Sequence, residues 1–137
     1  MFVDNPKTYM IERIVACLTY PTMGLVGFVW IIIGQITRSI PTTFTAYHCY
    51  LSIFLSLGYV IFNYLFWFLY NLITHIPFVN GVAAQIVYLF NMPLLYGYSF
   101  MQILIYGVIC YLALGGLWGK YSYLPWFSDI IKSIVKK

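Results

Sequence analysis

Two histidines stand in or beside the long apolar segments of this chain, and their imidazoles are the first groups to consider for chemistry. His48 lies in Tyr47-His48-Cys49, where it could contact a proton or a substrate, or make a hydrogen bond between helices. His75 lies in a more polar segment that is expected to be a loop. Neither histidine is accompanied by the further ligands that a metal site needs, so the sequence predicts no metal site and no cofactor.

Four uncharged amides share the same apolar setting: Asn63, Gln85, Asn91 and Gln102. With His48 they could line a hydrophilic path, or they could join helices through hydrogen bonds of about 0.6–2 kcal/mol each. Residues 39–119 contain no Asp, Glu, Lys or Arg, which argues against an ion-coupled pump or transporter. Because there is also no serine–histidine–aspartate set and no pair of carboxylates, we expect the chain not to be an enzyme.

The composition is that of a membrane protein. The chain has 137 residues, of which 63% are apolar and 7% are charged. A soluble domain carries about a quarter charged residues and could not cover its surface with the uncharged stretch 39–119. We therefore expect an integral membrane protein and exclude water-soluble enzymes, nucleic-acid-binding modules and disordered tails. The apolar runs are continuous, which argues against a transmembrane β-barrel.

These runs predict an all-α fold, a polytopic transmembrane helix bundle that forms a single domain over residues 1–137. Four spans are expected, over about 14–36, 44–72, 77–91 and 93–118, with a kink in the first at Pro21. Four spans would place six of the seven basic residues on the cytoplasmic or stromal side and only Arg38 on the other, as the positive-inside rule favours. Three spans are the alternative, because residues 82–90 alone are too short to cross the hydrocarbon core.

The C-terminal segment predicts an amphipathic interfacial helix over about 125–136. Its apolar side is expected to hold Trp126, Phe127, Ile130, Ile131, Ile134 and Val135, and its polar side Ser128, Asp129, Lys132, Ser133 and Lys136. We expect this helix to lie on the membrane surface, where anionic lipid headgroups would contact the lysines Lys120, Lys132, Lys136 and Lys137.

Three segments together resemble one protein family. They are residues 12–18 with Gly24 and Gly27, then Phe44 and His48 with residues 51–54, and finally residues 119–121 with 124–129. The family is that of the twenty-kilodalton Tic component, a protein import subunit of the chloroplast inner envelope, with its small bacterial relatives. Ala46 and Leu51 stand where the family has an arginine and a glutamine, so the resemblance implies the four-span helical fold more directly than a channel.

The resemblance implies a non-enzymatic membrane subunit associated with protein translocation, which would work with other membrane protein subunits. The membrane would be a bacterial inner membrane or a plastid or mitochondrial inner membrane. An alternative, based on the glycine-rich and aromatic packing surface, is a structural or accessory subunit of a large respiratory or photosynthetic complex. A third hypothesis is a vesicle-trafficking adaptor, because Tyr96-Gly97-Tyr98-Ser99 resembles a motif of Yip-type membrane proteins. None of these hypotheses includes a nucleic acid partner.

Overall fold

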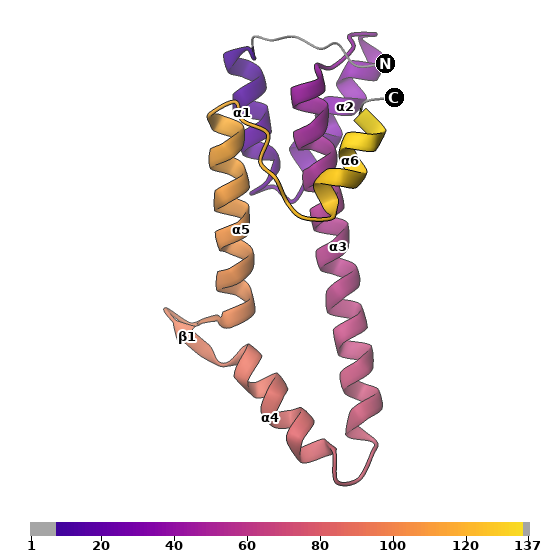
Figure 1. Ribbon diagram of the computed structural model, residues 1–137, viewed down its shortest axis with the longest axis vertical. Coiled ribbons are helices and arrows are strands. Elements are labelled where there is room, and N and C mark those ends of the chain that lie inside the picture. Colours follow the sequence, from indigo (N-terminus) through magenta and orange to yellow (C-terminus); the bar gives the residue numbers. More distant parts are fainter. Residues whose placement is uncertain (1–7, 136–137) are drawn as a thin grey trace. The chain divides into compact units, whose positions relative to one another are not determined.

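The structure is a computed structural model that describes residues 8–135, and its residues group into two compact units (Figure 1). Unit 1 comprises Met1–Leu57 and Ile109–Lys137, and unit 2 comprises Gly58–Val108. The elements in chain order are α1 (Met10–Thr19), α2 (Leu25–Ile36), α3 (Thr43–Thr74), α4 (Asn80–Asn91), β1 (Pro93–Leu95), β2 (Tyr98–Ser99), α5 (Phe100–Leu117) and α6 (Phe127–Val135).

The predicted all-helical class is confirmed, with the addition of a small antiparallel pair of strands, β1 and β2. Among the described helices, α3 and α5 are long and apolar enough to cross a membrane, judged by length and composition. They correspond to the predicted spans 44–72 and 93–118. A four-span bundle is not confirmed, because the other two predicted spans correspond to shorter helices.

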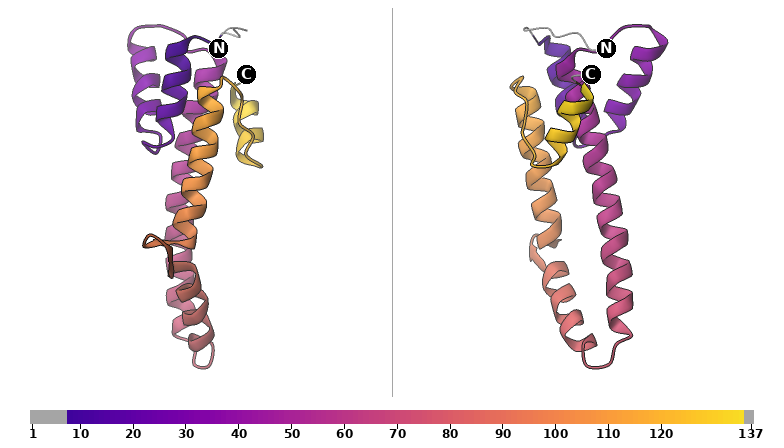
Figure 2. Two further views of the ribbon diagram at one scale, coloured as in Figure 1. Left: turned by 90° about the vertical axis from the view of Figure 1, so that its left-hand side faces the viewer. Right: turned by 45° about the vertical axis from the view of Figure 1, so that its right-hand side comes forward.

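The predicted first span, 14–36, is wrong as a continuous helix. The chain forms α1 and α2, which pack against each other as a hairpin, so Pro21 marks a reversal and not a kink (Figure 2). Proline removes a backbone donor and its ring opposes a continuing helix. Met23 and Gly24 then adopt positive φ angles of 51° and 84°, and the Gly24 N–H closes the turn on the Thr19 carbonyl at 2.8 Å.

The hairpin returns the chain to the start of α1, which changes the expected position of Arg38. The side chain of Thr42, between α2 and α3, donates a hydrogen bond to the Glu12 carboxylate at 2.7 Å. Arg38 therefore lies in a loop that ends beside the first turn of α1. A single span over 14–36 would have put Glu12 and this loop at opposite ends of the helix.

Unit 2 differs from the prediction at both ends of α4. The predicted span 77–91 is reduced to a helix of 12 residues, which is about 18 Å long. The helix begins late because Pro77 and Phe78 belong to a turn, in which Phe78 has a positive φ of 77°. The predicted span 93–118 begins instead with the β1–β2 hairpin, and α5 begins only at Phe100. Tyr96 and Gly97 have φ angles of 50° and 84°, the two positive values that a type I′ hairpin turn requires.

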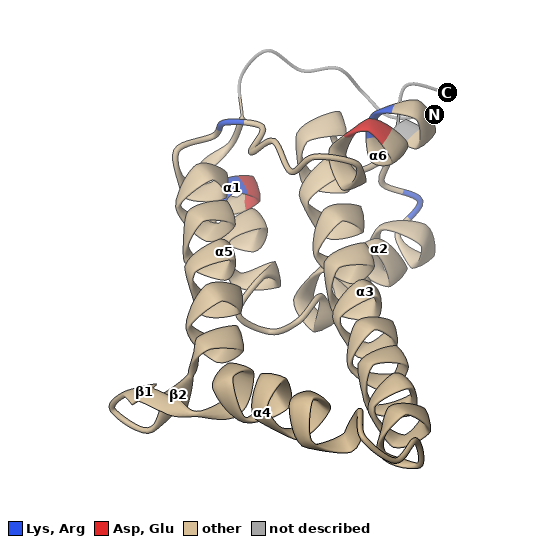
Figure 3. Ribbon diagram, turned by 60° about the horizontal axis from the view of Figure 1, so that its bottom comes forward, with Lys and Arg blue, Asp and Glu red and all other residues tan. Residues whose placement is uncertain are grey.

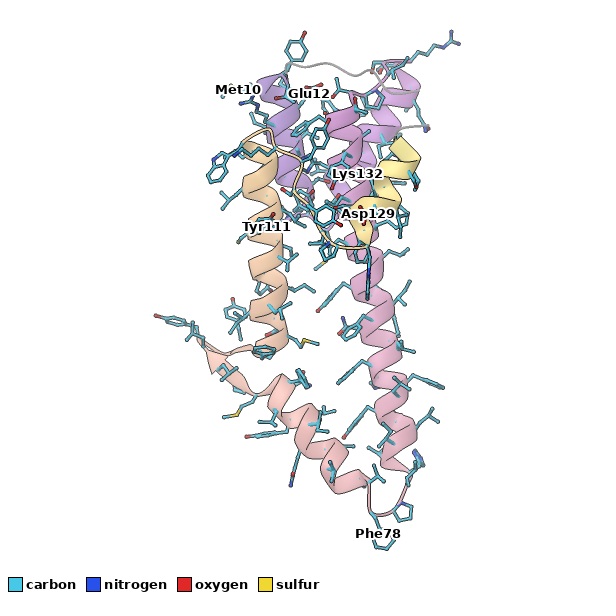
Figure 4. All side chains as sticks on the ribbon, viewed as in Figure 1. Met10, Glu12, Phe78, Tyr111, Asp129 and Lys132 are labelled. Carbon is cyan, nitrogen blue, oxygen red and sulfur yellow. The ribbon has the colours of Figure 1, made fainter. Side chains whose placement is uncertain are left out.

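The buried side chains lie in unit 1, with Ser99 as the one exception among the described residues. The helices and strands of unit 2 expose large apolar and aromatic side chains, and Phe78 is 99% exposed (Figure 4). Its residues also carry no formal charge, whereas unit 1 holds Glu12, Arg13, Arg38 and the charges of α6 (Figure 3). The core of the described chain is thus confined to unit 1.

The C-terminal amphipathic helix is present as α6, and its buried face differs from the predicted one. Ser128, which was predicted on the polar side, is fully buried together with Ile131 one turn later. Ile130 and Ile134 stay exposed and are four residues apart, so they share a face of the helix, and the exposed Trp126 stands just before α6 with a φ of 69°. Ser128 is buried because its hydroxyl makes hydrogen bonds with the Tyr47 hydroxyl and the Leu124 N–H, whereas the side of α6 that carries Ile130 and Ile134 stays exposed.

Candidate functional site

A buried group of polar side chains surrounds the first turns of α3 in unit 1. His48 is fully buried, and Thr45 and Ser52 lie on the same face of α3 three residues before it and four after it. The partners of this face come from α1, from the turn after α1, from the segment after α5 and from α6. We call Tyr20, Tyr47, His48, Ser122 and Ser128 the His48 cluster.

His48 joins two segments that are 100 residues apart in sequence. Its Nδ1 lies 2.7 Å from the Tyr20 hydroxyl, and its Nε2 lies 3.2 Å from the backbone carbonyl of Lys120. Because a carbonyl can only accept, Nε2 must carry the proton, and Nδ1 of the neutral ring then accepts from Tyr20. Both ring nitrogens are occupied, so the imidazole has no free lone pair for a substrate or a metal ion.

Aromatic rings enclose the imidazole on several sides. The Phe44 centroid lies 4.6 Å from that of His48, and Tyr20 and Tyr47 approach it edge-on at 5.8 and 5.4 Å. Tyr121 lies parallel to the imidazole, with an interplanar angle of 12°. This enclosure removes the imidazole from solvent and makes its two hydrogen bonds necessary for stability.

Tyr47 holds the C-terminal segment in the same way. Its hydroxyl lies 2.8 Å from the Ser122 carbonyl and 2.7 Å from the Ser128 Oγ. The Leu124 N–H donates to that Oγ at 2.7 Å. Through Tyr47, α3 therefore contacts both the segment after α5 and the first turn of α6.

A second pair of hydroxyls ties α1 to α3. Thr19 and Ser52 lie 2.8 Å apart, and the Ser52 hydroxyl also donates to the Cys49 carbonyl at 2.9 Å. With its proton used there, Ser52 accepts from Thr19. A Cβ on Gly27 of α2 would come within 3.1 Å of the Cys49 Cα and would collide with Thr19, so glycine is what permits this close packing.

The charged groups of unit 1 lie around the cluster and not inside it. Glu12 accepts hydrogen bonds from the Thr42 hydroxyl and from the Tyr9 N–H, the second at 2.9 Å. The bond from Tyr9 caps the first turn of α1. On the C-terminal side, Lys132 lies 5.1 Å from the centre of the Tyr123 ring, and Tyr123 donates to Asp129 at 3.0 Å. The hydrogen bond and the negative charge of Asp129 raise the pKa of the exposed Tyr123 phenol.

His48 and the four amides predicted with it belong to different units. Asn63, Gln85, Asn91 and Gln102 all belong to unit 2 and are exposed. Asn63 and Asn91 donate to the backbone carbonyls of Tyr59 and Val87, four residues earlier in their own helices. Gln102 accepts from the Ser99 N–H at 3.0 Å and so caps α5. Among the described residues, none of the four amides makes a hydrogen bond to another helix.

The predicted lipid-contacting lysines divide into two groups. The Lys120 and Lys132 side chains are exposed, while the Lys120 carbonyl takes part in the cluster. Lys136 and Lys137 lie outside the described residues. His75 is exposed in the turn after α3 and contacts the Asn71 carbonyl in the last turn of that helix. Within residues 8–135 no group of three His, Cys, Asp or Glu could hold a metal ion.

Most partners of His48 were not predicted from the sequence. The sequence predicts Ser128 only as a residue on the polar side of the C-terminal helix and gives no role to Tyr20, Tyr47 or Ser122. One usable signal was present: Thr45, His48 and Ser52 recur at intervals of three and four residues in an apolar helix, which is the spacing of a polar face that needs partners. No comparable spacing identifies the partners, because they come from loops and from a helix far along the chain.

The three segments that carry the family resemblance meet in unit 1. Residues 12–18 lie in α1, residues 44–54 in α3, and residues 119–129 in the segment after α5 and in α6. A Cβ on Gly116 of α5 would lie 3.2 Å from Ala16 of α1, and His48 of α3 contacts Lys120. Comparison of the chain with protein-family models, with curated proteins and with solved structures finds no match.

Proposed function

We propose that the chain is a non-enzymatic integral membrane subunit that works with partner proteins in moving polypeptides across or into a membrane, in the manner of the Tic family. The observation that supports this proposal best is the meeting of the three family-like segments around His48. Segments that resemble one family and lie far apart in sequence are expected to meet if the resemblance reflects a common fold. The hydrogen bonds of the cluster give that meeting a physical cause.

The chemistry of the cluster favours a scaffold over a catalyst. Both nitrogens of His48 are used, and both the imidazole and Ser128 are fully buried. Such a group holds segments together and offers no nucleophile or base to a substrate. Two helices of spanning length cannot enclose a pore of protein size, so a role in translocation requires partner subunits or further copies.

The arrangement in the membrane is part of the same proposal. α3 and α5 would be full spans, while α1 and α2, at about 15 and 18 Å, are each too short to cross. We propose that the α1–α2 hairpin enters and leaves the membrane on one side, in place of a full first span. Single cysteines at exposed positions, Met10→Cys and Ser39→Cys in a chain without other cysteines, test this with an impermeant maleimide. Labelling of both from the same side is expected, and labelling from opposite sides would restore a full first span.

A direct test replaces the native chain in its own membrane with variants and measures the import of a reporter precursor. His48→Ala is expected to reduce import, while His75→Ala, which alters an exposed histidine that contacts only the neighbouring Asn71 carbonyl, should leave import unchanged. The two variants are compared at equal amounts in the membrane. Import that is unchanged after complete depletion of the chain would exclude the proposal.

A second candidate, an accessory subunit of a respiratory or photosynthetic complex, is favoured by the exposed surface of unit 2. Gly107 on α5 has no atom within 4 Å of the position where a Cβ would stand, so that helix surface is open to a close neighbour. Purification in mild detergent separates the two candidates. Stoichiometric co-purification with a respiratory or photosynthetic complex would favour the second candidate, and co-purification with import components the first.

A further inference from the structure

A cavity of about 320 Å³ lies in unit 1 at the loop that joins α2 to α3. Its volume is at the lower end of the range for small-molecule pockets, about 300–1,000 Å³. The residues that line it come from the end of α2, the loop and the first turns of α3: Ile31, Gly34, Gln35, Arg38, Ser39, Ile40, Pro41, Ala46 and Tyr50. The cavity thus lies where an apolar helix ends and a helix of membrane-spanning length begins.

Arg38 is the one charged residue in this lining, and the lining contains no carboxylate. Its backbone has a φ of 52°, in the left-handed region, and its N–H contacts the Gln35 carbonyl at 3.3 Å. The preceding Thr37 bonds its hydroxyl to the Ile33 carbonyl and to Ser39, each at 2.8 Å, which fixes the turn. The guanidinium makes no hydrogen bond or ion pair with residues 8–135, so none of its five donors is occupied by a described residue.

Among the described residues, the acidic side chain of Glu12 lines a separate, smaller cavity. That cavity, of about 200 Å³, shares Gly34, Ser39, Ile40 and Pro41 with the first and is lined by Glu12 but not by Arg38. Both carboxylate oxygens of Glu12 already accept hydrogen bonds, from Tyr9 and from Thr42. The positive charge of the larger cavity is therefore not neutralised by a residue of its own lining.

We infer that the Arg38 cavity binds the phosphate of an anionic phospholipid. A guanidinium with free donors recognises a phosphate through paired, charge-assisted hydrogen bonds. Gln35 and Ser39 add uncharged polar groups for the glycerol and headgroup, and Ile31, Ile40, Pro41 and Ala46 offer an apolar wall to the start of an acyl chain. Basic pockets between membrane helices at the level of the headgroups bind lipids in this way. This inference does not rest on the proposed function and concerns a site other than the lysines near α6.

The test uses the full chain in mild detergent and native mass spectrometry with added dioleoylphosphatidylglycerol, with dioleoylphosphatidylcholine as the neutral lipid. Arg38→Asn removes the charge while asparagine tolerates the positive φ. Gln35→Trp fills the cavity at an exposed position and keeps the charge. Lys132→Gln removes one positive charge outside the cavity and is the matched control.

We expect the wild-type chain to retain one phosphatidylglycerol with at least about tenfold higher affinity than phosphatidylcholine, because the choline ammonium beside the phosphate of phosphatidylcholine is repelled by Arg38. Arg38→Asn and Gln35→Trp should each abolish this preference, and Lys132→Gln should keep it. Equal losses in Lys132→Gln and Arg38→Asn would overturn the inference, because they would show general attraction to positive charge. A preference that survives both cavity variants would do the same.

Competition with inorganic phosphate distinguishes a lipid-binding site from a site that binds any small anion. Millimolar phosphate should not displace the bound lipid, because it lacks the acyl chains that contact the apolar wall. Displacement of the lipid at that concentration would overturn the assignment to a phospholipid. The far-ultraviolet circular dichroism of each variant is measured in parallel, and Gln35→Trp, which alters an exposed residue, still tests the cavity if Arg38→Asn fails to fold.

Discussion

The two units of the chain are both rich in apolar residues, and they differ in whether those side chains are buried or exposed. Unit 1 buries its apolar side chains around a group of polar ones, and every buried side-chain nitrogen or oxygen described there has a hydrogen-bond partner. Unit 2 exposes its apolar side chains and carries no formal charge, and its amides Asn63 and Asn91 donate to the backbone of their own helices. Internal hydrogen bonds therefore help to specify unit 1, whereas the apolar side chains of unit 2 are left uncovered by the described residues.

The largest expected effect of a single substitution is at His48. His48→Ala removes both hydrogen bonds, leaves the buried Tyr20 hydroxyl without its acceptor and opens a cavity, so we expect a loss of about 3 kcal/mol in the free energy of unfolding. Equilibrium unfolding in mixed micelles measures this loss. His75→Ala in unit 2 is the matched control, with an expected change within about 0.5 kcal/mol. Equal effects of the two substitutions would remove the distinction between the units.

A glycine in each unit gives the next comparison. Gly27→Ala forces a Cβ against Thr19 and Cys49, and we expect a loss of about 2 kcal/mol. Gly107→Ala meets open space and should stabilise α5 by up to about 1 kcal/mol through helix propensity. Thermal unfolding of the purified chain measures both. A loss for Gly107→Ala only in the native membrane, together with loss of a co-purifying protein, would place a partner helix at that surface.

A smaller effect is expected at Tyr47, because only a hydroxyl is removed. Tyr47→Phe leaves the Ser122 carbonyl and the Ser128 hydroxyl without this partner, at a cost of about 1–1.5 kcal/mol. Hydrogen exchange of α6 should accelerate while that of α1 stays nearly unchanged. Tyr64→Phe, at an exposed tyrosine of α3, is the control and should alter neither. Unchanged exchange of α6 in Tyr47→Phe would mean that Tyr47 does not hold this helix.

The smallest expected effect is at the amides of unit 2. Asn63→Leu removes only a bond to the Tyr59 carbonyl of the same helix, so the free energy of unfolding should change by less than about 0.5 kcal/mol. If Asn63 lines a polar path for a polypeptide, import should nevertheless fall in the replacement assay. A large loss of stability would instead show that Asn63 joins helices in the assembled protein.

Sequence patterns were sufficient for the helical class and for the long helices, and insufficient where single residues reverse the chain. The charge-free stretch predicts apolar helices, and α3 and α5 follow from it. Pro21 predicts a disturbance of the first helix, but a kink and a full reversal begin with the same residue. The reversal depends on the positive φ angles of Met23 and Gly24 and on packing of α1 against α2. That packing is tertiary and leaves no local pattern.

The candidate site was predictable only at its centre. His48 is conspicuous as a titratable residue near the start of a long apolar helix. Its partners are ordinary in sequence, since Tyr20 is one of 14 tyrosines and Lys120 contributes a backbone carbonyl. Ser128 has the spacing of a polar helix face, and its burial depends on Tyr47, 81 residues earlier in the chain. Contacts over such separations follow from the fold and not from spacing.

The most direct test of the account asks whether Tyr20 and His48 are energetically coupled. A double-mutant cycle of Tyr20→Phe and His48→Ala, measured by equilibrium unfolding in mixed micelles, reports the interaction free energy of the pair. A coupling of at least about 1 kcal/mol is predicted, because the 2.7 Å hydrogen bond joins the turn after α1 to α3. Additive effects, within about 0.5 kcal/mol, would mean that these segments do not meet at His48 and would contradict the account.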